Sequence, residues 1–271
     1  MKICIVSKID AKEPIELAQS IGWELSNLGH EVVYEESTAS ELGYHGVSLS
    51  SLEADMLLVI GGDGSVLRAV RLMDKQIPVL GINQGQVGFL TDVEREHLSS
   101  CISSLRLPLK VEPRMRISVE CDGRSLGPAL NEAVIVTSRP AKMLIFSVYS
   151  NGQKIDTFRA DGLIISTPTG STAYAMSAGG PIVDPNLEAF LLAPIAPYML
   201  SSRPYLLQAS AELKIEMTSP QKSAILAIDG KDQYETGETA SIVIRKAESP
   251  ALFVDIGRTF FEKVEQKLRQ H

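Results

Sequence analysis

The chain has 271 residues, 44% of them hydrophobic and 22% charged, and 26 Lys and Arg against 33 Asp and Glu give a net charge of −7. This composition excludes a disordered chain, and the net acidity argues against a general nucleic-acid binder. Three distant cysteines and four histidines without ligand spacing favour neither a disulfide framework nor a histidine metal site, so we expect a reducing cytoplasm. No apolar run reaches the roughly 20 residues of a bilayer span, and the apolar start is too short for a secretory signal.

Short apolar runs alternate with helical patterns in the N-terminal part of the chain. We expect buried strands at 3–6, 31–34, 55–60 and 77–82. Helical spacing predicts one helix from Pro14 to a C-cap at Gly29, a second over 65–73 and a third over 94–105. Apolar strands that alternate with helices indicate a parallel sheet covered on both faces, so the fold class expected for 1–107 is α/β.

The pattern changes near 107–113 (LPLKVEP), beyond which short strands alternate with turn residues. We expect strands at 116–121, 133–137, 143–149, 154–158, 163–166, 213–217, 224–228, 241–244 and 252–254. Asn151-Gly152 between two of these runs is a strong hairpin signal. The series predicts an antiparallel, sandwich-type β domain over 108–257. Apolar residues at helical spacing then predict a C-terminal helix, at about 258–271, that packs back on the body.

The first motif with chemical character is Gly61-Gly62-Asp63-Gly64, where an expected strand runs into an expected helix. Glycines let backbone N–H groups approach a phosphate, and a helix N-terminus adds partial positive charge. The Asp63 carboxylate would repel phosphate, so it fits a hydroxyl nucleophile or a Mg²⁺ ion better. Arg68, one turn further on, is either a phosphate contact or a solvated surface residue. An ordinary glycine-rich turn remains the alternative, because neither a Rossmann nor a Walker A pattern is completed.

The second motif is the segment 161–174, where an apolar strand leads into the hydroxyl-rich turn STPTGST. A helix is expected to follow over 172–178. The Ser and Thr hydroxyls of this turn can hydrogen-bond ribose, adenine or phosphate. The alternative is an ordinary loop in which a Ser or Thr caps the helix.

Two weaker features lie near this segment. Asn131-Glu132 heads an expected strand, and Lys142 and Arg159 could supply the positive charge that the composition lacks. Arg159 stands two residues before Asp161, so alternation along a strand would place both on one face. An ordinary salt-bridged surface explains each of these residues taken alone.

Together these motifs resemble those of the NAD kinase family. The resemblance rests on five segments in family order: GGDG at 61–64, GINQGQVGFLTD at 81–92, NE at 131–132, DGLIISTPTGSTAYAMSAGGP at 161–181 and IDG at 228–230. Lipid kinases and phosphofructokinases carry loops similar to GGDG, whereas the segment 161–181 is close to a family signature.

The resemblance implies a fold of the class α/β plus β, with two domains. The first is a phosphofructokinase-like nucleotide domain (1–107, with the C-terminal helix), and the second is a β-rich dinucleotide-binding domain (108–257). The active site is expected between them. It implies phosphoryl transfer from ATP or polyphosphate to the 2′-hydroxyl of the adenosine ribose of NAD, giving NADP. Mg²⁺ or another divalent metal is expected, with ligands that we do not assign. A homodimer or homotetramer is also implied, and neither nucleic acid nor a membrane is an expected partner.

By the same resemblance, Asp63 is the base or orienter of the 2′-hydroxyl, and Gly61, Gly62 and Gly64 cradle phosphate beside Arg68. The expected NAD-binding positions are Phe89, Asn131, Glu132, Lys142, Arg159, Asp161, Thr172, Ala173, Tyr174, Ala175, Met176, Ser177 and Gln233. Lys142 stands where some relatives carry Arg, which keeps a point charge but loses bidentate geometry. The match at Gln233 is looser.

Two other functions stay open. A lipid or sugar kinase of the same superfamily would share GGDG, but the chain shows no basic membrane-binding run, and a sugar kinase does not explain the TPTGSTAY segment. A non-catalytic dinucleotide-binding regulator would keep the 161–181 segment and could dispense with Asp63. The intact GGDG favours the enzyme.

Overall fold

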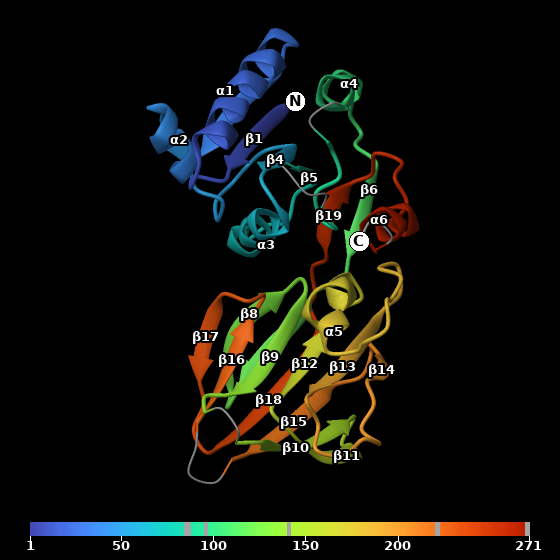
Figure 1. Cartoon of the computed structure of the whole chain (residues 1–271). Helices are drawn as coiled ribbons and strands as arrows, with labels where there is room; N and C mark the ends of the chain where they lie inside the picture. The colour runs from blue at the N-terminus through green and yellow to red at the C-terminus, as the bar shows by residue number, and fades with distance from the viewer. Residues whose placement is uncertain (84–87, 95–96, 140–141, 220–222, 269–271) are drawn as a thin grey trace. The chain divides into compact units, whose positions relative to one another are not determined.

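The chain divides into two compact units, which Figure 1 shows as a ribbon. In this computed structural model the structure describes residues 1–83, 88–94, 97–139, 142–219 and 223–268. Unit 1 comprises Met1–Pro113 and Ala251–His271, and unit 2 comprises Arg114–Pro250. Part of the GINQGQVGFLTD motif (84–87), two residues of the helix expected at 94–105 (95–96) and the last residues of the expected tail helix (269–271) lie outside the described residues.

Unit 1 is built on a seven-stranded sheet in the order β3-β2-β1-β4-β5-β19-β6. Its strands are β1 (Lys2–Ser7), β2 (Glu31–Glu35), β3 (Gly46–Val47), β4 (Met56–Ile60), β5 (Val79–Ile82), β6 (Val111–Arg114) and β19 (Ala251–Val254). Each neighbouring pair from β3 to β19 is parallel. The helices of this unit are α1 (Lys12–Asn27), α2 (Glu36–Leu42), α3 (Asp63–Leu72), α4 (Leu98–Ser104) and α6 (Phe260–Leu268).

Helices cover both faces of this sheet. Figure 1 shows α1 and α4 on one side and α3 on the other. Alternate residues of β4 explain the arrangement, because side chains along a strand point to opposite faces. Met56, Leu58 and Ile60 pack in one cluster with the apolar faces of α1 and α4. The continuous burial of β4 therefore reflects helices on both sides, as the sequence predicts.

Unit 2 is a sandwich of two six-stranded antiparallel sheets. The first has the order β11-β10-β15-β18-β7-β8 and the second the order β14-β13-β12-β9-β16-β17. The strands of the first are β7 (Ile117–Cys121), β8 (Arg124–Ala129), β10 (Leu144–Ser150), β11 (Gln153–Ala160), β15 (Leu213–Thr218) and β18 (Thr239–Lys246). Those of the second are β9 (Glu132–Thr137), β12 (Gly162–Ser166), β13 (Ala189–Ile195), β14 (Tyr205–Gln208), β16 (Ala224–Ile228) and β17 (Asp232–Glu235).

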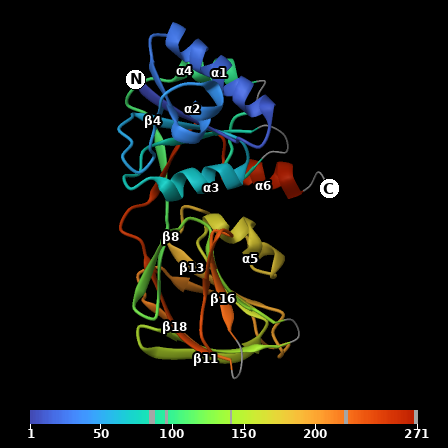
Figure 2. The same ribbon diagram turned by 90° about the vertical axis from the view of Figure 1, so that its left-hand side faces the viewer.

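The core of unit 2 lies between the two sheets. Phe146 from the first sheet and Phe190 from the second are fully buried in one cluster. The outer face of the second sheet has its own cover, because α5 (Tyr174–Ser177) packs against β12 and β13 (Figure 2). A 3₁₀ turn (Thr169–Thr172) precedes α5. The motif 161–181 thus begins inside the sandwich and ends on its outer surface.

The predicted hairpin is confirmed. Asn151 and Gly152 have φ of 47° and 78° between the antiparallel strands β10 and β11. Two successive positive φ values are the requirement of the tight turn that Asn-Gly favours. The predicted α/β unit with a parallel sheet and the predicted β-rich unit are both present.

One predicted strand belongs elsewhere. The run 252–254 was expected in the β-rich domain, but β19 pairs in parallel with β5, through Phe253 and Val79, in the sheet of unit 1. A short apolar run suits a central parallel strand as well as a sandwich strand, so the pattern alone does not choose between them. The chain therefore returns to unit 1 at Ala251, whereas the sequence predicted that it returns at about residue 258. The sequence also left α2 and β3 unpredicted.

Within the described residues, no helix is both long enough and apolar enough to cross a bilayer.

Candidate active site

Asp63 is the first residue of α3, directly after the buried strand β4 and the two glycines. Its carboxylate accepts two backbone hydrogen bonds, from Phe89 N–H to Oδ2 at 2.8 Å and from Leu90 N–H to Oδ1 at 3.0 Å. The side chain is still 31% exposed. Two N–H donors fix the carboxylate in one orientation and leave it accessible to solvent.

Gly88 makes the close approach of this loop to Asp63 possible. A Cβ at Gly88 would lie 1.9 Å from Asp63 Oδ1 and 2.3 Å from Thr91 Oγ1. The Gly88 N–H also donates to Thr91 Oγ1 at 3.0 Å. The glycine is therefore required by space, because any side chain would push the Asp63 carboxylate away from the loop.

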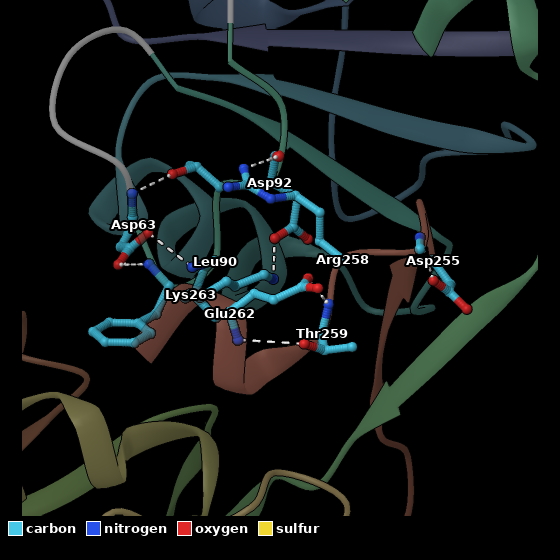
Figure 3. A network of polar contacts seen from close by, with 12 residues as sticks. Asp63, Leu90, Asp92, Asp255, Arg258, Thr259, Glu262 and Lys263 are labelled. Carbon is cyan, nitrogen blue, oxygen red and sulfur yellow. Dashed lines mark hydrogen bonds and ion pairs between the residues drawn. The ribbon is translucent and has the colours of Figure 1, made fainter. Parts of the chain in front are cut away.

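A polar network joins the segment 89–94 to the C-terminal helix α6 (Figure 3). Lys263 forms a buried ion pair with Asp92. Arg258 donates to the Asp92 carbonyl oxygen at 3.2 Å and to Glu94 Oε1 at 3.3 Å. The helix itself begins with reciprocal hydrogen bonds between Thr259 and Glu262, a capping box. The tail predicted to pack back on the body does so through these contacts.

The same helix brings a second lysine to Asp63. Lys267 Nζ lies 4.0 Å from Asp63 Oδ2 and 4.1 Å from the centre of the Phe89 ring. Burial lowers the pKa of Lys267 below its ordinary value, while the Asp63 charge acts in the opposite direction. The Phe89 ring also lies 6.4 Å from the Phe260 ring. Phe89 thus contributes its backbone to Asp63 and its ring to the lysine.

Arg68 has a carboxylate partner within unit 1. Its guanidinium donates to Glu35 Oε1 at 2.9 Å and to Ser37 Oγ at 3.3 Å. Glu35 is buried, which raises its pKa, but the Thr38 N–H and Arg68 outweigh burial and hold that pKa below its ordinary value. Arg68 therefore has a structural ion pair, and its contact with a donor phosphate stays a prediction.

In unit 2, the polar residues 131 and 132 lie where neighbouring strands of the second sheet end. Glu132 at the start of β9 pairs with Ser166 at the end of β12, and Ala133 pairs with Ile228 at the end of β16. The Asp229 carboxylate accepts the N–H groups of Leu130, Asn131 and Glu132 at 2.8, 2.8 and 3.1 Å. The IDG segment thus fixes the backbone of the NE pair.

Glu132 is buried beside the Asp229 carboxylate. Burial and the Asp229 charge raise its pKa to about 8. Within the described residues its Oε2 atom has no hydrogen-bond partner, and neither has the buried Thr169 Oγ1. Buried polar atoms are ordinarily hydrogen-bonded. These two atoms therefore mark this end of the sheet as a place where a polar ligand would be held.

The hydroxyls of the 166–172 turn serve mainly the protein itself. Ser166 and Thr167 donate to the carbonyl oxygens of Asn131 and Leu130 at 3.1 and 2.6 Å. The Ser171 hydroxyl exchanges hydrogen bonds with the backbone of Val183, and the Thr172 hydroxyl donates to the Thr169 carbonyl oxygen. These hydroxyls therefore bind backbone groups of the protein, and their contact with a nucleotide stays a prediction.

Gly170 lets the turn close on the NE pair. A Cβ at this position would lie 2.3 Å from the Asn131 carbonyl oxygen and 2.5 Å from Ser166 Oγ. The turn and the start of β9 are therefore in direct backbone contact. The motifs 131–132 and 161–181, far apart in the sequence, form one structure.

The side chains of the segment 172–177 differ in their exposure to solvent. Tyr174 and Ser177 are exposed, Ala173 and Met176 are half-buried and Thr172 is buried. Ala175 is fully buried against Val134 and Ile164 on the outer face of the second sheet. Only the exposed and half-buried members offer side chains to a ligand, whereas Ala175 holds α5 on the sheet.

Asp161 is separated from Glu132 by the length of a strand. The Asp161 carbonyl oxygen accepts the Thr137 N–H at 3.0 Å, at the far end of β9. Arg159 lies in β11 of the other sheet, with its guanidinium 5.6 Å from the Tyr198 ring centre. The chain bends at Asp161 between the two sheets, so strand alternation does not place these two residues on one face.

The remaining predicted residues are exposed. Lys142 precedes β10 near the end that Arg159 occupies, because Ile145 pairs with Arg159. Gln233 lies on the edge strand β17, opposite Ala227 and close to the turn at Asp229. Within unit 2 the structure thus brings Asn131, Glu132, Thr169 and the 172–177 segment together and places Lys142, Arg159 and Asp161 at the opposite strand ends.

No group of three or more His, Cys, Asp or Glu in the described parts of the chain is arranged to hold a metal ion. A cavity of about 630 Å³ in unit 1 has Asp92, Cys101 and Arg258 in its wall. None of the predicted site residues that the structure describes lines it.

Two family models match most of the chain. The ATP-NAD kinase N-terminal domain model matches residues 3–106, and the ATP-NAD kinase C-terminal domain model matches residues 130–256. The chain is 67% identical to an NAD kinase of Methanocorpusculum labreanum and 52% identical to that of Methanoculleus marisnigri, each over 99% of both chains. These matches define a phosphotransferase.

Two solved structures have the same architecture. One is an NAD kinase from Archaeoglobus fulgidus in complex with ATP, with a TM-score of 0.84 and 31% identity over all of both chains. The other is a yeast NADH kinase complexed with NADH, with a TM-score of 0.89, 25% identity, and coverage of 100% of this chain and 87% of that one. The chain belongs to the NAD kinase family.

Sequence reasoning missed several residues that build the site. Gly88, Leu90 and Lys267 complete the surroundings of Asp63, and Asp229 fixes the NE pair. The glycine and the aspartate lie inside the quoted motifs GINQGQVGFLTD and IDG, so a signal for them existed. Nothing in the sequence distinguishes Lys267 from the other lysine of α6.

Proposed function

We propose that this NAD kinase transfers the γ-phosphoryl group of ATP to the 2′-hydroxyl of the adenosine ribose of NAD, with Asp63 as the residue that receives or orients the hydroxyl proton. The observation that carries the proposal is the Asp63 carboxylate, held by two backbone N–H donors and still accessible at the start of α3. The 2′-oxygen forms the new bond to phosphorus, the bond to the ADP oxygen breaks, and the hydroxyl proton passes to Asp63.

The reaction needs little from the base. Phosphoryl transfer has a loose transition state, so the protein mainly positions the reactants and neutralises charge. The hydroxyl oxygen need not lose its proton early. Asp63 therefore acts as much by orienting the hydroxyl as by accepting its proton, and its rigid attachment to the 89–90 backbone suits that role.

ATP is the donor that we favour, because the Archaeoglobus fulgidus relative was solved with ATP. Inorganic polyphosphate is the alternative donor. The glycines at 61, 62 and 64 and the N-terminus of α3 are the groups proposed to receive the phosphates. A divalent cation such as Mg²⁺ is proposed to arrive bound to the donor phosphates and to neutralise their charge.

Unit 2 is proposed to hold the dinucleotide at the shared ends of β9, β12 and β16. Asn131, Glu132 and Thr169 supply polar atoms there, and Tyr174 supplies an exposed ring. Phe89, Lys142, Arg159, Asp161 and Gln233 stay predicted NAD contacts. The yeast relative was solved with NADH, so NADH is a second acceptor to test.

The test is a discontinuous assay with NAD or NADH, Mg²⁺, and either ATP or polyphosphate. NADP formation is read afterwards with an NADP-specific dehydrogenase, and the position of the new phosphate by ³¹P NMR. We expect Asp63→Asn to leave NAD binding, measured by calorimetry, within about threefold and to lower kcat by at least about a hundredfold.

Exposed Glu248→Gln in unit 2 is the matched control and should leave kcat unchanged. Equal losses of NAD affinity and of kcat in Asp63→Asn would contradict the proposed role. NAD binding by the native chain without turnover with either donor would instead favour a dinucleotide-binding regulator.

A further inference from the structure

The C-terminal helix α6 carries two lysines, one turn apart, whose surroundings differ. Lys263 is buried in a closed ion pair with Asp92. Lys267 is 25% exposed, and its ammonium lies 4.0 Å from Asp63 Oδ2. A separation of 4.0 Å is longer than a hydrogen bond, so Lys267 does not spend a donor on Asp63. The first lysine anchors the helix, and the second keeps its donors beside an accessible carboxylate.

The position of the Lys267 ammonium is defined from two sides. The Phe89 ring lies 4.1 Å from Nζ, within the range of a cation–π contact. The same residue donates its backbone N–H to Asp63. The ring, the carboxylate and the ammonium are therefore parts of one rigid arrangement, which Lys263 and Arg258 hold on the segment 92–94.

We propose that Lys267 is a further catalytic residue, whose ammonium contacts the phosphoryl group during transfer and balances its negative charge beside Asp63. The inference rests on the proposed function of Asp63. A carboxylate next to a transferring phosphoryl group adds repulsion, and a cation within about 4 Å offsets it. A lysine acts here as a point charge with three donors, which suits the spread charge of the transferring group.

The charge of Lys267 also makes the rate sensitive to alkaline pH. Burial lowers the pKa of Lys267, against the effect of Asp63, which faces it from α3. Lys263, on the same helix, has its charge paired with Asp92. Loss of the Lys267 proton should therefore reduce activity at high pH, at a pH below the ordinary lysine range. A guanidinium does not titrate there.

The experiment compares two substitutions at one position. Lys267→Met keeps the apolar stem against Phe89 and removes the charge, whereas Lys267→Arg keeps the charge. With saturating ATP and NAD, we expect Lys267→Met to lower kcat at least about tenfold while the KM for NAD changes less than about threefold. Lys267→Arg should recover most of the rate, and its activity relative to the native enzyme should rise as the pH is increased toward the ordinary pKa of a lysine.

Lys110→Met is the charge-matched control, because Lys110 is exposed and pairs with Asp255, elsewhere in unit 1. It should leave kcat unchanged. The proposal is wrong if Lys267→Met keeps kcat within about threefold of the native value, or if Lys267→Arg and Lys267→Met lose the same activity together with thermal stability. A native enzyme that forms no NADP would instead refute the proposed function, and this inference with it.

Discussion

Glu132 has a buried carboxyl oxygen, Oε2, for which the described residues supply no hydrogen-bond partner. The carboxyl group is buried beside the Asp229 carboxylate, and its pKa is raised to about 8. A structural role alone would be filled more stably by an apolar side chain, because burying a polar atom without a hydrogen-bond partner is unfavourable. The Asn131-Glu132 pair was a weak functional signal in the sequence, because the sequence does not show which residues surround it. Burial and the Asp229 contacts to the backbone at 130–132 are the observations on which its proposed role in binding rests.

The raised pKa of Glu132 predicts how stability depends on pH. The native state keeps a proton that the unfolded state releases between about pH 4.5 and 8, so the native state binds more protons and its stability falls as pH rises through that window. Glu132→Gln removes this contribution. The stability of the variant relative to the native protein should therefore increase by up to about 1.4 kcal/mol per pH unit across the window.

Urea unfolding of both proteins at several pH values measures this difference. Glu248→Gln, at an exposed position of the same unit, is the control and should show no such trend. A difference between native protein and Glu132→Gln that stays constant from pH 5 to pH 8 would show that Glu132 is ionised in the folded state.

At the scale of elements, the loop 88–91 depends on one glycine. A Cβ at Gly88 would overlap Asp63 Oδ1 at 1.9 Å. Gly88→Ala should therefore displace the Asp63 carboxylate and lower kcat by more than about tenfold, with a loss of stability of about 1–3 kcal/mol from overpacking. Gly237→Ala is the control, because its Cβ would meet only the Thr239 carbonyl oxygen, at 3.7 Å. Native kcat in Gly88→Ala would mean that the loop does not position Asp63.

In the C-terminal helix, the amphipathic pattern predicted the packing of the apolar face but not the polar contacts. Its apolar spacing predicted packing on the body, and α6 does pack in unit 1. The pattern did not show that Lys263 would be buried against Asp92 or that Lys267 would reach Asp63. Both contacts join residues that are distant in the sequence, so helical periodicity holds no information on them.

At the scale of the whole molecule, the two units are predicted to differ in autonomy. Unit 2 is one continuous segment, Arg114–Pro250, with its own core between two sheets. Unit 1 needs the chain end, because β19 lies between β5 and β6 in its sheet. Residues 114–250 expressed alone should therefore unfold cooperatively in urea, whereas residues 1–113 alone lack an interior strand and α6 and should not.

Circular dichroism and hydrogen exchange of the two fragments test this prediction. The fragment 1–113 joined by a flexible linker to residues 251–271 is the control and should regain cooperative unfolding. A cooperative transition in 1–113 alone would show that β19 is dispensable. The number of copies in the native protein stays a prediction, which light scattering would measure.

The two kinds of sheet, the hairpin at Asn151-Gly152 and the family were all predictable from the sequence, because periodicity, turn residues and contiguous motifs are local properties of the chain. The packed structure was needed to show that β19 belongs to the parallel sheet, that Ser166 and Thr167 donate to the backbone at 130–131 and that Lys267 and Gly88 lie beside Asp63. These features depend on distances between residues far apart along the chain, and such distances are fixed only when the sheets and helices pack.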